Sequence, residues 1–246
     1  MLELFADYHT HSQYSHGKGN IVGNIEVAIR KGLEAIAITD HGPAMAFGLG
    51  VKRASDLLQI KAEIRQVQQY FPQVKVLAGV EANILNEAGD LDVPAEILAQ
   101  LDLVLVGLHP NLFPRLESLR LLGYHYGGKL SRTLNARARK FNTQALVNAV
   151  QRHPVDIVTH PGLKLAVDTK ELAQVCAARG TALEINSSHG YLTTEFVQVA
   201  VAAGVKFAIN SDAHRPEDVG NLAAGLAIAE KVGLTAADII NARYIQ

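Results

Sequence analysis

Two histidines separated by one residue lie near the start of the chain, directly after a stretch of alternating character. The alternation over residues 2–8 predicts a strand, in which positions i and i+2 face the same side. His9 and His11 therefore project together from the end of this strand, with Asp7 in phase behind them. Because imidazole is a common ligand of zinc and other transition metals, the pair predicts a metal site.

Ligand-type residues also follow the other stretches that we expect to be strands. The hydrophobic pattern predicts seven strands, at about 2–8, 34–39, 74–80, 102–107, 155–159, 181–185 and 205–210. Six of them run into histidine or a carboxylate: His9, His11 and His16 after the first, His41 after the second, Glu81 after the third, His109 after the fourth, His160 after the fifth, and Asp212 and His214 after the last. The sixth strand, followed by residues 186–189, is the exception.

Nine such residues on one rim would lose their hydration without partners, so an uncompensated cluster is costly to bury. Bound cations are the simplest compensation. A purely structural polar rim is the alternative. The sequence also contains 10 histidines in all, an unusual number for a chain with 48% hydrophobic and 19% charged residues.

Helical stretches alternate with the strands, and glycine often marks the boundary. Gly32, Gly180 and Gly204 each stand between a helical stretch and an apolar strand, where glycine accepts the left-handed conformation. Strands that are apolar on both faces are typical of parallel sheets covered by helices. We predict an α/β fold, a closed or nearly closed β/α (TIM-like) barrel, with an open doubly wound sheet as the alternative. Both folds place functional groups at the carboxyl ends of the strands.

Several helix boundaries can also be predicted. The spacing of apolar residues over 55–71 predicts a helix. Asp168 and Glu171 form a capping-box pattern that opens the helix before the sixth strand. Residues 235–242 predict a short final helix with Thr235 as its N-cap.

Composition limits the possible partners. A chain of 246 residues with a formal net charge of −1 suits a single domain over 1–246 and gives no general basis for binding nucleic acid or acidic membranes. We expect no signal peptide and no transmembrane segment. The single cysteine, Cys176, excludes an internal disulfide and favours a reducing, cytoplasmic setting. The sequence does not predict the oligomeric state.

The strand-end motifs together resemble those of the PHP (polymerase and histidinol phosphatase) family. They are D-x-H-x-H, T-D-H, G-x-E, H-P-G and S-D-x-H, at residues 7–11, 39–41, 79–81, 160–162 and 211–214. The segments I-T-D-H-G-P, G-x-E-A-N-I and N-T-Q-A, the last at residues 142–145, resemble the stand-alone bacterial phosphatase branch. The resemblance implies a distorted seven-stranded β/α barrel that holds three metal ions at the carboxyl strand ends, usually zinc, with manganese or iron also compatible.

The resemblance also implies a ligand set for each metal. His9, His11, Glu81 and Asp212 would hold the first metal; Glu81, His109 and His160 the second; and His16, His41 and His214 the third. Glu81 would then bridge two metals.

Three dications would favour an anionic substrate, and a phosphate ester fits best. Metals bridged by Glu81 can supply a bridging hydroxide as the nucleophile, and Asp212 is our candidate for handling a proton. Arg215, Lys164 and His189 are candidate substrate contacts. Asp7 is predicted to orient a histidine of the first strand, whereas Asp40 is expected to point away from its neighbour on the strand.

A basic insertion is expected at about 111–140. It contains Arg115, Arg120, Lys129, Arg132, Arg137, Arg139 and Lys140 but only one acid, Glu117. We interpret it as a lid or specificity segment at the rim, with a solvated helix or a subunit contact as the alternative.

The leading functional prediction is a metal-dependent phosphomonoesterase acting on a small phosphorylated metabolite. Phosphodiesterase or nuclease activity is the enzymatic alternative, although nucleic acid is disfavoured because no series of stacking aromatics is present. An amidohydrolase is disfavoured by Gly107, which stands where that class usually carries a bridging lysine. A non-catalytic, metal-stabilised module is the alternative from a different class.

Overall fold

The computed structural model describes residues 2–114, 116, 118–128 and 130–244. Seven parallel strands form one sheet in the order β2 (Ala6–Thr10), β3 (Ala35–Ile38), β4 (Lys75–Asn83), β5 (Leu103–Gly107), β6 (Ile157–Val158), β7 (Ala182–Asn186) and β8 (Phe207–Asn210). The sheet curves until β2 meets β8, where His11 N donates to Ala213 O at 2.8 Å. The predicted seven-stranded, nearly closed barrel is therefore confirmed.

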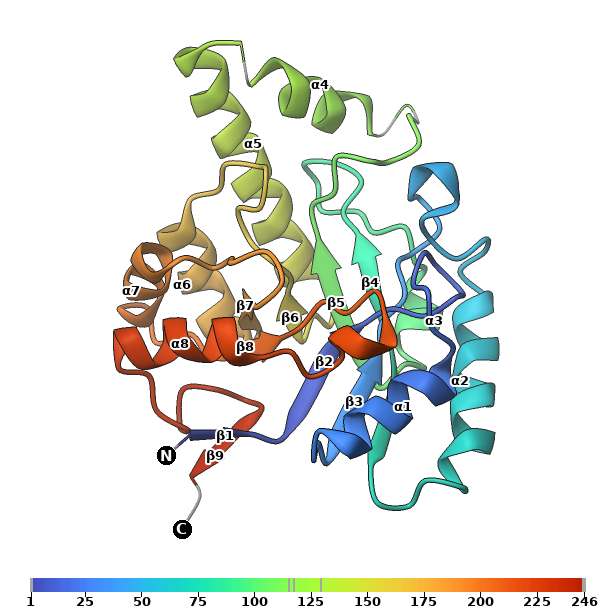
Figure 1. Ribbon diagram of the computed structural model, residues 1–246. Helices are drawn as coiled ribbons and strands as arrows, with labels where there is room; N and C mark the ends of the chain where they lie inside the picture. The colour runs from blue at the N-terminus through green and yellow to red at the C-terminus, as the bar shows by residue number, and fades with distance from the viewer. Residues whose placement is uncertain (1, 115, 117, 129, 245–246) are drawn as a thin grey trace.

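Helices surround this sheet (Figure 1). They are α1 (Ile21–Arg30), α2 (Asp56–Gln68), α3 (Ala95–Leu98), α4 (Leu119–Gly127), α5 (Arg132–Arg152), α6 (Thr169–Arg179), α7 (Thr194–Val201) and α8 (Ala223–Val232), with short 3-10 turns η1 (Ala46–Gly48) and η2 (Pro216–Asp218). The helix predicted over 55–71 corresponds to α2. The predicted cap of α6 is confirmed, since the Asp168 carboxylate accepts from Glu171 N at 3.2 Å.

The strand predicted over 2–8 is divided in two at Phe5. Its first part, β1 (Leu2–Leu4), pairs with β9 (Ala242–Tyr244) in a separate two-stranded sheet. Asn241, fully buried beside the break, donates from Nδ2 to Ala6 O at 2.8 Å and to Ile209 O at 2.7 Å. This side chain therefore satisfies backbone groups of β2 and β8 at the end of the barrel opposite the histidines.

The final helix predicted over 235–242 is wrong. The segment instead forms turns and pairs with the start of β8: Phe207 N donates to Asp238 O, and Ile240 N donates to Phe207 O, both at 2.8 Å. The Thr235 hydroxyl donates to the Asp238 carboxylate at 2.6 Å and does not cap a helix. Long-range pairing thus outweighs the local helical pattern.

The segment 111–140 contains α4 and the first residues of α5. In Figure 1, α4 lies at the end of the molecule toward which β4 and β5 point. Two of its basic residues pair with acids outside the segment: Arg139 with Asp168 at 2.6 Å and Arg120 with Glu87 at 3.6 Å. Arg115, Glu117 and Lys129 lie outside the described residues.

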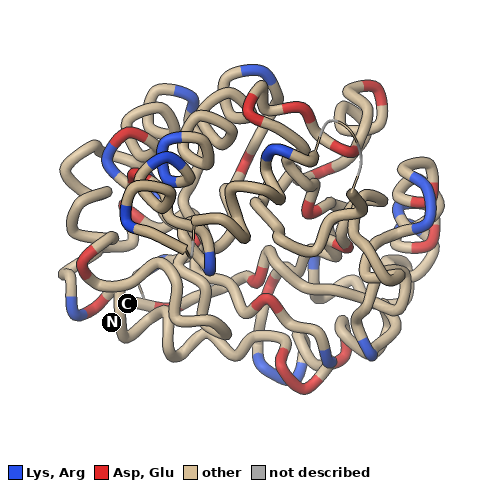
Figure 2. The backbone as a smooth tube through the Cα atoms, turned by 90° about the horizontal axis from the view of Figure 1, so that it is seen from above, with Lys and Arg blue, Asp and Glu red and all other residues tan. Residues whose placement is uncertain are grey.

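Basic and acidic positions interleave around the backbone (Figure 2), in keeping with the near-zero net charge. Within the described part of the chain, no helix combines the length and the apolar character needed to cross a lipid bilayer.

Candidate metal centre

The interior of the barrel changes from apolar to polar along the strands. Residues paired in register share a face, so Leu105, the register partner of Glu81, also points inward. Leu105 packs with Ile157, Ala182 and Ala208 in a small cluster separate from the main core. Glu81 itself is fully buried. The apolar layer therefore lies toward the amino ends of the strands, and the polar layer lies toward their carboxyl ends.

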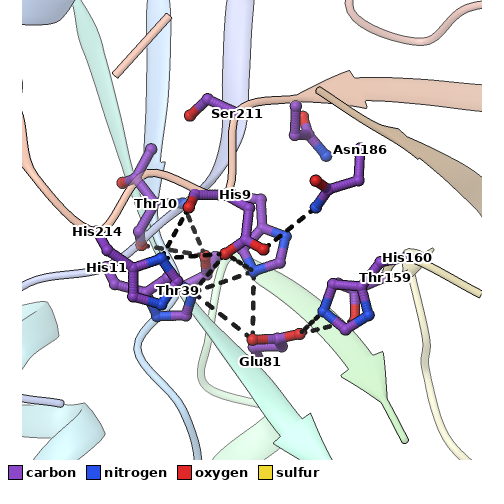
Figure 3. Close-up of polar contacts among 12 residues, drawn as sticks. His9, Thr10, His11, Thr39, Glu81, Thr159, His160, Asn186, Ser211 and His214 are labelled. Carbon is purple, nitrogen blue, oxygen red and sulfur yellow. Dashed lines mark hydrogen bonds and ion pairs between the residues drawn. The ribbon is translucent and has the colours of Figure 1, made fainter. Parts of the chain in front are cut away.

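The Glu81 carboxylate lies within 3.2 Å of four imidazoles, and Figure 3 shows two of them, His9 and His160. Its Oε2 is 3.2 Å from His9 Nε2 and 2.8 Å from His41 Nδ1. Its Oε1 is 3.2 Å from His109 Nε2 and 3.0 Å from His160 Nε2. Because these histidines come from four different strand ends, the fold gathers separate parts of the sequence around one carboxylate.

Asp212 forms a second carboxylate of the cluster. Its Oδ1 lies 3.2 Å from His11 Nε2 and 3.5 Å from His214 Nδ1. The rings of His11 and His214 stack with their centroids 4.3 Å apart. The ring centroid of His16 lies 5.1 Å from that of His41 and 4.2 Å from that of His214. All nine predicted rim residues are thus brought together.

Burial and charge shift the pKa values of this cluster in both directions: burial alone would lower those of His9 and His160, but the neighbouring carboxylates raise them. Burial alone would raise the pKa of Glu81, but His41, His9 and His109 hold it well below its usual value. Burial lowers the pKa of His41 to about 4 and outweighs the attraction of Glu81. Burial and the neighbouring His41 also keep the pKa of His11 well below its usual range. Ionised carboxylates and neutral imidazoles are the forms that coordinate metals.

Several polar atoms of the cluster have no aligned hydrogen-bond partner among the described residues. They include His11 Nδ1, His41 Nδ1, Glu81 Oε2 and His109 Nε2. The short contact between His41 and Glu81 is therefore a close approach without hydrogen-bond geometry. Since buried polar atoms normally find partners, these orphaned atoms fit divalent cations.

Three groups of three residues each bring their potential ligand atoms within 4.8 Å of one another. They are His9, His11 and Asp212; His41, Glu81 and His109; and His11, His41 and His214. These groups overlap the three predicted ligand sets. His41 belongs to two of the groups, so it stands where the second and third predicted sets meet.

Glu184 is a member of the site that the sequence interpretation missed. It lies in β7, fully buried, with Oε1 2.8 Å from His9 Nδ1, while Oε2 accepts from His160 N at 2.8 Å. Asn186 and Asn210 also donate to this carboxylate, at 3.1 and 3.0 Å. The available signal was an acid within a strand otherwise suited to burial, a rare arrangement unless the charge is paired.

Asn83, the last residue of β4, orients another imidazole of the site. His109 Nδ1 lies 2.7 Å from Asn83 Oδ1, and Asn83 Nδ2 donates to the half-buried Asp92 carboxylate at 2.6 Å. Such contacts fix the orientation of an imidazole and leave its other nitrogen free to coordinate.

Asp7 does not orient a histidine ring, contrary to the prediction. Its carboxylate accepts from the Ser211 hydroxyl at 2.5 Å and from Gly220 N at 2.9 Å, and so ties β2 to the segment after β8. Asp40 points away from His41, as expected, and accepts from Ser12 N at 2.8 Å.

Two glycines leave the space that the site requires. A Cβ at Gly107 would lie 2.6 Å from both His109 Cε1 and Thr159 Oγ1. A Cβ at Gly17 would lie 2.7 Å from backbone atoms of His11, against which the loop carrying His16 packs. Both positions therefore exclude larger side chains.

The three candidate substrate contacts have different positions. Six of the nine rim residues line a pocket of about 150 Å³, and Lys164 and His189 also line it. His189 Nε2 is 3.4 Å from Asp212 Oδ2. Arg215 is exposed at the start of η2 and does not belong to the described lining of this pocket.

Known proteins resemble this chain over nearly its whole length. A probable phosphatase of Caldanaerobacter subterraneus is 32% identical over 98% of this chain and 88% of that protein. A probable phosphatase of Shewanella sediminis is 32% identical over 98% of this chain and 90% of that protein's length. The structure of histidinol phosphate phosphatase from Lactococcus lactis, complexed with zinc, L-histidinol and phosphate, matches with a TM-score of 0.64, 19% identity and 94% coverage of both chains. The PHP domain model matches residues 7–188, and the chain therefore belongs to the PHP domain family.

Proposed function

We propose that this protein hydrolyses a phosphate monoester of a small metabolite at a centre of three divalent ions, zinc foremost, held by the nine rim residues. The broader class, a metal-dependent phosphatase, is supported by family membership and by relatives named as probable phosphatases. The observation that carries the proposal is Glu81, an ionised and fully buried carboxylate among four imidazoles. We also propose a cytoplasmic location, supported by the single, buried cysteine.

Bound divalent cations supply a water of lowered pKa as the nucleophile and neutralise charge on the phosphoryl oxygens. The protein's own side chains position the cations and the nucleophile. Glu81 holds its four histidines together, and Glu184 fixes His9. Asp212, whose Oδ2 accepts from Asn186 at 3.2 Å and faces His189, is proposed to hold the proton of the nucleophile or of the leaving group.

The size and lining of the metal pocket support a small anionic headgroup. Its volume of about 150 Å³ suits a phosphoryl group. Lys164 and His189 line the same pocket and are proposed to contact the phosphoryl oxygens.

The test compares the native protein with Glu81→Ala. We expect zinc, manganese or iron in purified native protein by elemental analysis, and hydrolysis of p-nitrophenyl phosphate that Glu81→Ala abolishes together with part of the metal content. Glu230→Gln, an exposed position on α8, is the matched control and should retain both. A fully metal-loaded protein that hydrolyses no member of a broad phosphate-ester panel would instead establish a non-catalytic module.

A further inference from the structure

A second and larger cavity lies beside the metal pocket. Its volume is about 740 Å³. It is formed by the loop between β6 and α6, the loop between β7 and α7, the outer face of α7, and Arg139 of α5. None of the nine metal-site residues lines it among the described residues, so the metal centre does not account for it.

The two cavities share one wall. Lys164 lines both cavities. On the same loop, His160 lines the metal pocket and Gly162 lines the larger cavity. The loop after β7 divides in the same way, with His189 lining the metal pocket and Tyr191 the larger cavity. The larger cavity therefore lies next to any group bound at the metals, on the other side of Lys164.

Apolar side chains form one part of the wall of the larger cavity. Leu165 and Val167 are buried in its wall, and α7 presents Phe196 and Val199 to it with 38% and 42% of their surfaces exposed. Tyr191 packs toward Gly162, whose Cβ position would be 3.4 Å from the Tyr191 ring. Four charged side chains complete the lining, those of Arg139, Lys164, Asp168 and Lys170. Apolar walls with a limited number of polar groups are typical of sites that bind organic molecules.

The acid in the lining is already engaged. The Asp168 carboxylate accepts from Arg139 at 2.6 Å and from Glu171 N at 3.2 Å. A polyhydroxy compound such as a sugar would therefore bury hydroxyls against an apolar wall at a cost in free energy. An aromatic or large aliphatic group would instead gain the contacts that the wall offers.

We propose that this cavity holds the alcohol part of the substrate and that this part is large and mostly apolar, as in an arylalkyl phosphate. The proposal rests on the proposed function, because the phosphoryl group is placed in the metal pocket. It assigns Phe196 and Val199 as specificity-determining residues, with Lys164 at the boundary between the phosphoryl group and the alcohol.

The experiment compares 2-phenylethyl phosphate with ethyl phosphate, two esters of primary alcohols with similar leaving groups. We expect kcat/KM to be higher for the phenylethyl ester. Val199→Asp and Phe196→Ala should each reduce this preference about tenfold, mainly through KM, which corresponds to about 1.4 kcal/mol. Val201→Asp is the matched control, since Val201 is on the same helix, is 43% exposed and does not line the cavity. It should preserve the preference.

Equilibrium binding separates this proposal from the proposed function. Dissociation constants of 2-phenylethylphosphonate and ethylphosphonate, measured calorimetrically on the metal-loaded protein, do not depend on turnover. Tighter binding of the phenylethyl compound that Val199→Asp abolishes supports the cavity assignment even if no ester is hydrolysed. Hydrolysis of both esters with equal kcat/KM, and equal binding of both phosphonates, overturns the cavity assignment and leaves the phosphatase activity intact.

Discussion

Glu184 Oε1 lies 2.8 Å from His9 Nδ1, and both residues are fully buried. The other oxygen of Glu184 accepts from the backbone N–H of His160. The Glu184 carboxylate therefore holds the His9 imidazole at the end of β2 and the backbone N–H of His160 after β6. The φ angle of His160 is 29°. Such a conformation is unfavourable for a residue with a side chain, so the Glu184 hydrogen bond helps to hold it.

Replacing Glu184 by glutamine should weaken metal binding. The amide keeps the size of the carboxylate but cannot accept through both oxygens, so either His9 or His160 loses its partner. Loss of such an orienting contact typically costs 10–100-fold in metal affinity or activity. Competition with a chromogenic chelator measures the affinity directly. Glu96→Gln, at an exposed position of α3, is the control, and equal affinities in the two variants would contradict the orienting role.

A methyl group at position 107 should disturb the site without altering a ligand. In Gly107→Ala the new Cβ would meet His109 Cε1 at 2.6 Å, so the imidazole must move away from Glu81. We expect reduced metal content and a lower melting temperature. Gly123→Ala, where a Cβ meets no atom within 4 Å, should leave metal content unchanged and stabilise α4 slightly. Normal metal occupancy in Gly107→Ala would show that the ring can relax.

Removing the metals should destabilise the fold. A ligand that binds only the folded state adds RT ln(1 + [L]/Kd) to the free energy of unfolding, which is about 4 kcal/mol at a thousand times Kd. Treatment with EDTA should therefore lower the melting temperature in differential scanning fluorimetry, and added zinc should restore it. An unchanged melting temperature in protein proven metal-free by elemental analysis would be inconsistent with a folded-state metal site.

Asp102 gives a pH dependence that is independent of the metals. Burial alone would raise its pKa, but hydrogen bonds from Lys61 at 2.5 Å and from Ala78 N at 3.0 Å lower it overall. A lowered pKa in the folded state stabilises the protein above the unfolded-state value of about 4 and is lost as the pH falls through the folded-state value. The difference in free energy of unfolding between native protein and Asp102→Asn, from urea titrations, should therefore be largest at neutral pH and should shrink below about pH 4. A difference independent of pH would refute this coupling.

Cys176 should be inert in the folded protein. It is fully buried on α6, and burial raises the pKa of its thiol to about 12. Because the thiolate is the reactive form, Ellman's reagent at pH 8 should release almost no thionitrobenzoate from native protein and one equivalent after denaturation. Rapid labelling of the native protein would show that α6 opens readily.

The sequence alone determined which residue types end the strands. Strand, glycine and ligand patterns are local, so the barrel, the nine rim residues and the cap at Asp168 could be predicted from spacing. The division of the first strand at Phe5 and the absence of a helix over 235–242 depended on pairing with distant segments. Only the tertiary structure decided the role of Glu184, 175 residues from His9, and the cavity behind Lys164. Both depend on contacts between segments remote in the chain: strands β2 and β7 for Glu184, and the loops after β6 and β7 for the cavity. A local sequence pattern does not determine such contacts.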